Sequence, residues 1–290
     1  MPRLLKTLAE LGRISNLPTV WTNLAAGWVL GGGGVALGSG YDFRLFWLCA
    51  GGSLVYFAGM ALNDAADARW DREHGKDRPI PRGDVSALAV WLLSGAALLL
   101  GSVLMISLGG AKPLWVGLLA ASLVIYDLYH KPWAGSVIFM AGCRVFLLLS
   151  AASVVASEIS QTTLLRALCL GSYVIGLTLL ARGENGGDRR WSTFGTFLLA
   201  APLALTISEL PPLRGAAVIT PILVLIAALA WLLPVVFGKT LPFPKRIGSL
   251  LAGLALVDAL AVATREPYLA LLFVLLTPVL LLWQRWVAAT

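Results

Sequence analysis

Four oxygen-bearing side chains are concentrated in one short stretch, NDAADARWD, at residues 63–71. Asn63, Asp67 and Asp71 are spaced at i, i+4 and i+8. Asp64 precedes Asp67 by three residues, so in a helix all four side chains share one face. Like charges at this spacing repel one another, and hard oxygen ligands favour Mg²⁺ or a related ion. The alternative interpretation is a solvated helix end followed by a charged loop.

A second acidic pair occurs in the stretch ARGENGGDRR. Glu184 and Asp188 are again spaced at i, i+4, and Arg182, Arg189 and Arg190 flank them. Two such clusters predict two half-sites that face one another. Mg²⁺ rarely occupies an all-protein cage, because it keeps several waters and recruits phosphate oxygens. The two clusters with their basic neighbours therefore predict a site for a diphosphate.

The elements that carry these clusters are strongly apolar. Of the 290 residues 58% are hydrophobic, and the mean hydropathy is +0.83, too high for a soluble domain. A helix needs about 20 apolar residues to cross roughly 30 Å of hydrocarbon. Runs of this kind lie at 15–37, 44–66, 86–108, 113–130, 135–157, 163–182, 192–208, 215–237, 247–264 and 267–287. They predict an integral membrane protein of ten helical spans, and their continuous apolarity argues against a β-barrel.

The positions of lysine and arginine predict the orientation of these spans. With a cytoplasmic N-terminus, sixteen of the 22 basic residues fall at cytoplasmic ends or loops, five lie outside, and Arg144 lies within a span. This bias predicts that both termini are cytoplasmic, and a bacterial-type inner membrane is the expected location. It also accounts for the net charge of +7 without a nucleic-acid partner. Both acidic clusters then lie at inward helix ends, so the predicted ligand is a diphosphate whose hydrocarbon tail stays in the bilayer.

Both acidic motifs resemble those of a known enzyme family. NDAADARWD resembles the NDxxDxxxD signature of the UbiA-type intramembrane prenyltransferases, and ENGGD resembles their second, DxxxD-type signature. RISNLPTVWTNLAAGW in the first span and YDLYHK after the fourth also match, so the resemblance covers nearly the whole chain. Glu184 stands where Asp is usual, and Tyr126 and Lys131 are one residue further apart than in many members. These departures, with CR at 143–144 and LARGE at 180–184, resemble the EboC-type subgroup.

The resemblance implies an all-α membrane fold in which nine spans form a ring around a central lipophilic cavity; the tenth span would be an addition. Residues 1–290 would form a single transmembrane prenyltransferase domain, with cytoplasmic cap loops at about 64–85, 127–134 and 183–192. The implied reaction transfers a prenyl group from a polyprenyl diphosphate to a lipophilic acceptor through an allylic carbocation. Two Mg²⁺ ions would bridge the diphosphate.

The resemblance also assigns site residues in three groups. The implied metal ligands are Asn63, Asp64, Asp67, Asp71, Glu184 and Asp188, with Asp64 as a ligand or a partner of a ligand. The implied catalytic residues are Asp67, Asp71, Asp188, Lys131 and Arg72. The side chains of Lys131 and Arg72 would neutralise the charge of the departing pyrophosphate. The implied substrate-binding residues are Asn16, Arg78, Tyr126, Arg144 and Arg182. Aromatic walls for the carbocation are expected among Trp21, Trp28, Tyr56, Phe57, Tyr129, Phe139, Phe146 and Tyr173.

Two charged residues fall inside predicted spans, where an unpaired charge is costly. Arg144 is expected to face the cavity or to pair with the acidic cluster. Asp258 has no catalytic motif around it, and a helix–helix hydrogen bond is predicted for it. Either Asp84 or Ser86 is expected to cap the third span.

The sequence is compatible with three functions. The first is prenyl transfer. The second is an intramembrane terpene cyclase, in which the same site ionises the donor and the cation is captured within its own chain. The third is a cation-coupled transporter whose carboxylates bind at a repeat interface. Product analysis separates the first two, and the third requires a site near the middle of the bilayer.

Overall fold

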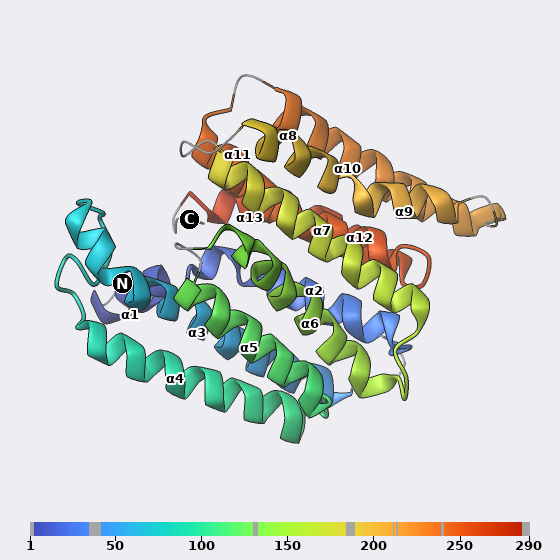
Figure 1. Ribbon diagram of the computed structural model, residues 1–290. Helices are drawn as coiled ribbons and strands as arrows, with labels where there is room; N and C mark the ends of the chain where they lie inside the picture. Colours follow the sequence, from blue (N-terminus) through green and yellow to red (C-terminus); the bar gives the residue numbers. More distant parts are fainter. Residues whose placement is uncertain are drawn as a thin grey trace.

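The structure is a computed structural model that describes residues 3–34, 42–129, 133–183, 189–210, 212, 214–238 and 241–285. Every regular element in these ranges is a helix, and Figure 1 shows their arrangement. The α-helices are α1 (Arg3–Leu11), α2 (Pro18–Leu30), α3 (Phe43–Glu73), α4 (Ala87–Val103), α5 (Pro113–Tyr129), α6 (Val137–Val155), α7 (Gln161–Gly183), α8 (Arg189–Leu198), α9 (Ala201–Glu209), α10 (Ile219–Phe237), α11 (Phe243–Ala252), α12 (Leu254–Val262) and α13 (Pro267–Trp283). The shorter segments are η1 (Ile14–Asn16), the π-helical η2 (Leu104–Leu108), η3 (Ala134–Ser136) and η4 (Gly215–Val218).

Each predicted apolar run corresponds to one helix or to two successive helices. Within the described ranges, five helices are long and apolar enough to cross a membrane, by length and composition, and three shorter apolar helices accompany them. The third predicted span begins where the sequence places it, because the Ser86 side chain accepts a hydrogen bond from the backbone N–H of Ala89. Ser86, rather than Asp84, is therefore the cap.

Two of the predicted runs are broken into pairs of helices. The run at 192–208 is divided between α8 and α9, and Pro202 occupies one of the first positions of α9. The run at 247–264 is divided at Gly253, where a Cβ atom would lie 2.6 Å from the hydroxyl oxygen of Tyr173. That hydroxyl donates a hydrogen bond to the Leu250 carbonyl at 2.9 Å. Tyr173 thus supplies a partner for a carbonyl at the helix end.

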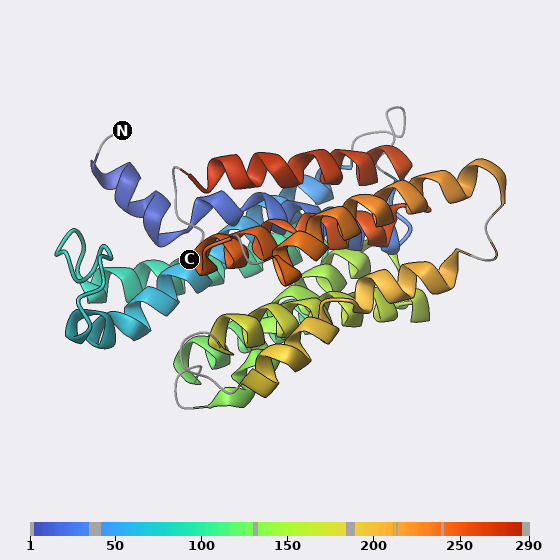
Figure 2. The ribbon, with the colours of Figure 1, turned by 90° about the horizontal axis from the view of Figure 1, so that it is seen from above.

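The helices run side by side, and α2 lies among them in contact with α3, α6 and α12. Figure 1 shows both chain ends, the end of α3 and the loop 74–86 at one end of the bundle, where α7 also ends. Viewed from above in Figure 2, α13 lies along one side of the bundle, where it contacts α12, α10 and α11. At the end of α2, Gly31 packs closely against α6, because a Cβ there would lie 2.5 Å from the Ala152 carbonyl oxygen.

The helix α3 connects the interior of the bundle to this polar end. It is 31 residues long, which corresponds to about 46 Å at 1.5 Å per residue. It begins at Asp42, whose side chain accepts a hydrogen bond from the Arg44 backbone N–H. Since the hydrocarbon core is about 30 Å thick, the polar stretch 63–73 continues the helix beyond its apolar part.

Candidate functional site

The first acidic motif lies on the last turns of α3, as predicted. Asp64 and Asp71 are buried, and Asn63 and Asp67 are half-buried. Arg72, which was expected to face the departing pyrophosphate, is exposed at the helix end. The motif therefore presents its amide and carboxylate oxygens toward neighbouring elements, while Arg72 lies at the surface.

The Asp64 carboxylate is held between two arginine side chains. Arg13 Nη2 lies 3.2 Å from Asp64 Oδ1, and Arg78 Nη1 contacts the same oxygen. Arg78 Nε also lies 3.5 Å from Asp71 Oδ2. The Asp64 side chain is only 5% exposed, compared with 18% for Arg13 and 30% for Arg78. The two guanidinium groups thus offset part of the negative charge of the carboxylates on α3.

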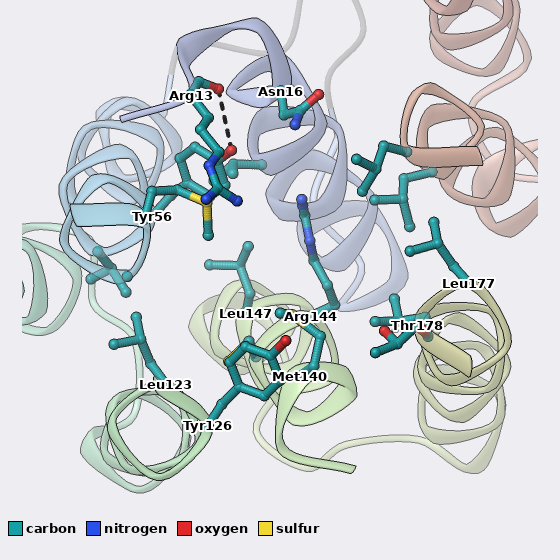
Figure 3. A pocket seen from close by; sticks show the side chains of 18 of the residues that line it. Arg13, Asn16, Tyr56, Leu123, Tyr126, Met140, Arg144, Leu147, Leu177 and Thr178 are labelled. Carbon is teal, nitrogen blue, oxygen red and sulfur yellow. Dashed lines mark hydrogen bonds between the residues drawn. The ribbon is translucent and has the colours of Figure 1, made fainter. Parts of the chain in front are cut away.

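Arg13 reaches this position through an unusual backbone conformation. Its φ of 40° is the only positive φ of a non-glycine residue in the described ranges. The Arg13 carbonyl accepts a hydrogen bond from the Tyr56 hydroxyl at 3.3 Å, which Figure 3 shows as a dashed line. A strained backbone is retained where the surroundings fix it, and such positions cluster at functional sites. In the sequence Arg13 is one of the sixteen basic residues counted at cytoplasmic ends, and its place in the site was not predicted.

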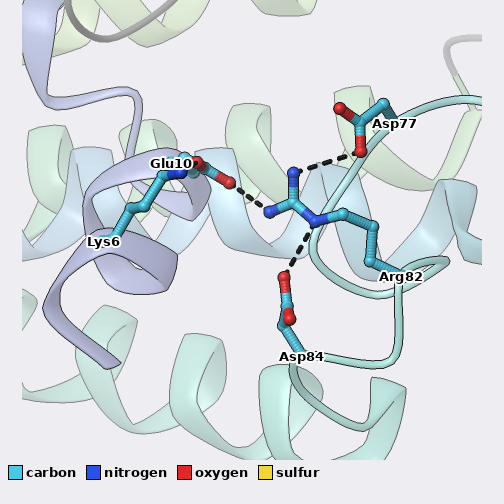
Figure 4. A network of polar contacts seen from close by, with 5 residues as sticks. All are labelled: Lys6, Glu10, Asp77, Arg82 and Asp84. Carbon is cyan, nitrogen blue, oxygen red and sulfur yellow. Dashed lines mark hydrogen bonds and ion pairs between the residues drawn. The ribbon is translucent and has the colours of Figure 1, made fainter. Parts of the chain in front are cut away.

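The loop 74–86 presents Arg78 to the carboxylates and is fastened to α1. Arg82 contacts Glu10 on α1, Asp77 at 3.2 Å and Asp84 at 2.8 Å (Figure 4). The hydrogen bonds to Glu10 and Asp84 raise the pKa of the Arg82 guanidinium above its usual value. The Arg82 side chain is 34% exposed and Asp77 is 82% exposed, so water screens these charges and each pair contributes little to stability alone, but together they fix the course of the loop.

A cavity of about 350 Å³ lies beside the acidic end of α3. Side chains and backbone from α2, α3, α5, α6, α7, α11 and α12 enclose it, together with the segment before α2 (Figure 3). Most of its lining is apolar and includes Val20, Val55, Met60, Leu119, Leu123, Met140, Leu147, Val174, Leu177, Ile247, Leu251 and Leu254. Among the aromatic residues expected to form its walls, Tyr56 lines it, whereas Tyr173 bonds to the Leu250 carbonyl and Trp28 lies under the Arg44 guanidinium.

Three of the predicted substrate-binding residues line this cavity: Asn16, Tyr126 and Arg144. Asp127 lines it too and was missed, although it lies within the quoted stretch YDLYHK. Asn63 Nδ2 donates to Asp127 Oδ1 at 3.3 Å. This hydrogen bond links the acidic end of α3 directly to the cavity lining.

The Arg144 side chain is held by α2. Its Nη1 donates to the Thr19 carbonyl at 3.0 Å and its Nη2 to the Thr19 hydroxyl at 2.8 Å. Arg144 therefore faces the cavity, as expected, and its hydrogen bonds go to Thr19, not to the acidic cluster. Asp258 on α12 accepts from Thr22 at 2.6 Å and from Asn23 at 3.4 Å, both on α2. The helix–helix hydrogen bond predicted for Asp258 is confirmed.

The second acidic motif follows α7. Arg182, at the end of that helix, donates to the Ser136 hydroxyl at 2.9 Å and lies near enough to Tyr126 to interact electrostatically with it. Glu184, Asp188 and Lys131 lie outside the described residues. The described residues therefore place Arg182 beside the cavity residue Tyr126, at the end of the bundle where α3 also ends.

The donor set at the end of α3 fits a hard divalent ion that is bound partly by other ligands. Asn63, Asp67 and Asp71 offer an amide and two carboxylates, all oxygen donors. Within the described ranges, no three His, Cys, Asp or Glu side chains form a group that could hold a metal alone. An ion there would need further oxygens from a substrate or from the segment 184–188, as is usual for Mg²⁺.

Comparison with solved structures finds the same fold at low sequence identity. A UbiA homologue from Archaeoglobus fulgidus bound to DMAPP and Mg²⁺ has a TM-score of 0.61 and 14% identity, covering 89% of this chain and 98% of that one. An apo UbiA homologue from Aeropyrum pernix K1 has a TM-score of 0.57 and 17% identity, covering 89% and 97%. A digeranylgeranylglyceryl phosphate synthase structure has a TM-score of 0.55 and 18% identity, covering 100% and 99%. A search of curated proteins finds no match.

The comparison with sequence profiles of protein families is more specific than the comparison of folds. The sequence profile of the UbiA prenyltransferase family matches residues 19–263, which include α2 to α12 and the whole cavity lining except Arg13 and Asn16. The long apolar helices agree with the membrane location of such proteins. The chain is therefore an integral membrane protein that belongs to the UbiA prenyltransferase family.

Proposed function

We propose that this enzyme transfers a prenyl group from a polyprenyl diphosphate to a lipophilic acceptor, through an allylic carbocation. The observation that carries the proposal is the continuity between the polar end of α3 and the apolar cavity, joined by the Asn63–Asp127 hydrogen bond. A diphosphate at the carboxylates would have its hydrocarbon tail beside the cavity. The similar structure from Archaeoglobus fulgidus, bound to DMAPP and Mg²⁺, supports the choice of donor.

The proposal includes two Mg²⁺ ions. They would neutralise the negative charge of the diphosphate and so make it a better leaving group. Asn63, Asp64, Asp67 and Asp71 from α3, with Glu184 and Asp188, form the proposed ligand set. Asp64 fits better as a partner of the arginines, because one of its oxygens already contacts both guanidinium groups. We therefore assign it the task of orienting Arg13 and Arg78.

The basic residues around this site would bind the diphosphate. Arg78 is held against Asp64 and Asp71 but remains 30% exposed, so part of its guanidinium is accessible to a ligand. Arg182, which lies near the cavity residue Tyr126, would also bind the diphosphate, together with Lys131 and Arg72, which the sequence resemblance assigns to this task. Each well-placed donor of this kind is worth about 3 to 4 kcal/mol toward charge developing on a leaving group.

The cavity would protect the carbocation from water. Its lining is mainly apolar, and the rings of Tyr56 and Tyr126 are its aromatic members among the described residues. An aromatic face stabilises a cation by about 0.5 to 2 kcal/mol. The same apolar lining disagrees with the water-filled path that a cation-coupled transporter would need.

The topology and domain organisation belong to the same proposal. The basic ends predicted to be cytoplasmic fall at the end of the bundle that holds both chain ends (Figure 1). We propose a cytoplasmic N-terminus, a bacterial-type inner membrane, and a single domain over residues 1–290 with cap loops at about 64–85, 127–134 and 183–192.

The test is Mg²⁺-dependent turnover of geranyl, farnesyl and geranylgeranyl diphosphates by the purified protein with a lipid extract. Asp67→Ala should reduce pyrophosphate release by at least about a hundredfold while the variant stays folded, because a ligand is lost and no packing. Asp77→Ala is the matched control, since that carboxylate is 82% exposed in the neighbouring loop. Pyrophosphate release retained by Asp67→Ala would refute the proposal. Mass analysis of the products distinguishes transfer from cyclisation.

A further inference from the structure

Gln284, at the end of α13, bridges two walls of the cavity. Its Nε2 donates a hydrogen bond to Asn16 Oδ1 at 3.3 Å and another to the Gly248 carbonyl at 3.1 Å. Asn16 lines the cavity, and Gly248 follows the lining residue Ile247 on α11. An amide nitrogen carries two N–H groups, so these two bonds fix how the Gln284 amide is turned. The family profile matches residues 19–263, so this contact comes from a helix beyond the matched segment.

Asn16 extends this contact toward the acidic end of α3. Asn16 is only 5% exposed, and because its side-chain oxygen faces Gln284, its nitrogen is turned toward other neighbours. The Asn16 side chain lies close enough to the Tyr56 hydroxyl to hydrogen-bond with it. The Tyr56 hydroxyl in turn donates to the Arg13 carbonyl, as the dashed line in Figure 3 shows. Gln284, Asn16, Tyr56 and Arg13 therefore form one chain of polar contacts.

Arg13 is the member of this chain that needs support. Its φ of 40° is a strained conformation for an arginine, and such a backbone persists only where its surroundings fix it. Its guanidinium lies 3.2 Å from Asp64 Oδ1, beside the proposed diphosphate site. Because the side chain is long, a small rotation of the Arg13 backbone moves the guanidinium much further. The end of α13 also packs against η1, the segment that follows Arg13, so α13 affects where this guanidinium lies.

Resting on the proposed function, we propose that Gln284 is a positioning residue for the diphosphate site. Through Asn16 and Tyr56 it keeps the Arg13 backbone in its left-handed conformation, and thereby keeps the guanidinium where it can bind the donor's diphosphate. Gln284 itself is not among the described residues that line the cavity. Its loss should therefore weaken diphosphate binding without removing a group that touches the substrate.

The experiment uses the full chain in nanodiscs of zwitterionic lipid. Isothermal titration calorimetry measures its affinity for inorganic pyrophosphate in the presence of Mg²⁺. Gln284→Leu removes both N–H groups and keeps a side chain of similar size, so it should weaken this affinity about three- to fivefold. Gln284→Glu should weaken it at least as much, because an ionised carboxylate cannot donate to Asn16 or to the Gly248 carbonyl.

Steady-state kinetics provide a second readout for Gln284→Leu. The KM of the donor should rise by a factor similar to the loss of pyrophosphate affinity, while kcat changes less than about twofold. The reason is that Arg13 would bind the diphosphate both before and during its departure, and the loss of such uniform binding appears in KM.

Tyr56→Phe tests the middle of the chain, because it keeps the aromatic ring at the cavity and removes only the hydroxyl that donates to Arg13. It should also weaken pyrophosphate binding about three- to fivefold. Combining it with Gln284→Leu should add no further loss, since both changes break the same chain.

Gly248→Ala tests the chain without changing any of its members. The new Cβ would lie 2.6 Å from Gln284 Oε1, which is the end of a flexible side chain, so the Gln284 amide is displaced and the fold is kept. This variant should reproduce the loss of affinity of Gln284→Leu.

Gln161→Leu is the matched control, since Gln161 is exposed at the start of α7, and it should leave the affinity unchanged. Circular dichroism checks that each variant stays folded. Unchanged affinity in Gln284→Leu, or losses that multiply in its combination with Tyr56→Phe, overturn the inference. The titration requires neither acceptor nor turnover, so it is separate from the test of the proposed function, which fails through retained pyrophosphate release in Asp67→Ala.

Discussion

Replacing Asp64 by asparagine tests whether this carboxylate holds the two arginines in place. At 3.2 Å and an effective dielectric constant of about 20, the attraction between Asp64 and Arg13 is about 5 kcal/mol before desolvation. Removing one partner of a buried pair costs about 3 to 5 kcal/mol. Arg13 and Arg78 are partly exposed, so water replaces some of the lost contact. We therefore expect Asp64→Asn to lower the free energy of unfolding by about 2 to 3 kcal/mol.

The assay is reversible unfolding in mixed micelles with increasing SDS, followed by tryptophan fluorescence. Asp77→Asn makes the same chemical change in an exposed carboxylate that lies 3.2 Å from Arg82, and it should cost less than about 0.5 kcal/mol. A double-mutant cycle of Asp64→Asn with Arg78→Gln should give a coupling of about 1 kcal/mol or more. If Asp64→Asn were as stable as Asp77→Asn, or if the coupling energy between Asp64 and Arg78 were zero, the inference that Asp64 holds Arg13 and Arg78 in place would be wrong.

Two further changes separate stability from catalysis. Asp258→Ala should lower the free energy of unfolding by about 1 to 2 kcal/mol, because its partners on α2 lose a buried acceptor, while pyrophosphate release changes less than about twofold. A larger effect on release than on stability would move Asp258 into the site. Gly51→Ala should cost about 1 to 3 kcal/mol in the same unfolding assay, since its Cβ would lie 2.7 Å from the Gly101 carbonyl oxygen of α4. Gly95→Ala, where nothing lies within 4 Å, should be nearly neutral, and equal effects at both glycines would contradict the packing argument.

The sequence predicts the apolar helical segments, five of which are long and apolar enough to cross a membrane within the described ranges, and the helical face of the first acidic motif. Both follow from local patterns: long apolar runs, and oxygen-bearing residues spaced at one turn on α3. It also predicts the bond of Asp258, because an acid inside a span must find a partner. These features need no knowledge of which helices are neighbours.

The side-chain contacts between different helices could not be predicted from the sequence. Four acidic and amide residues on one face look equivalent along the chain, yet Asp64 contacts two arginines from segments before and after α3. Arg144 was expected to reach the acidic cluster if paired, but the nearest partner in space is Thr19 on α2. Asp127 lacks a motif of its own and enters the site through Asn63. The signal for Arg13 was its position three residues before Asn16, which also lines the cavity.

The unbroken length of α3 has a mechanical consequence. The single helix α3 both lines the apolar cavity and carries the carboxylates, and no loop between these two parts could absorb a movement. Gly52 and Asp71 are about 28 Å apart along its axis, so leaning the rod by about 10° would carry the carboxylates sideways by about 5 Å. Membranes of unequal thickness tilt such rods differently. We therefore expect bilayer thickness to affect turnover, because a change in the tilt of α3 would move the carboxylates relative to the cavity.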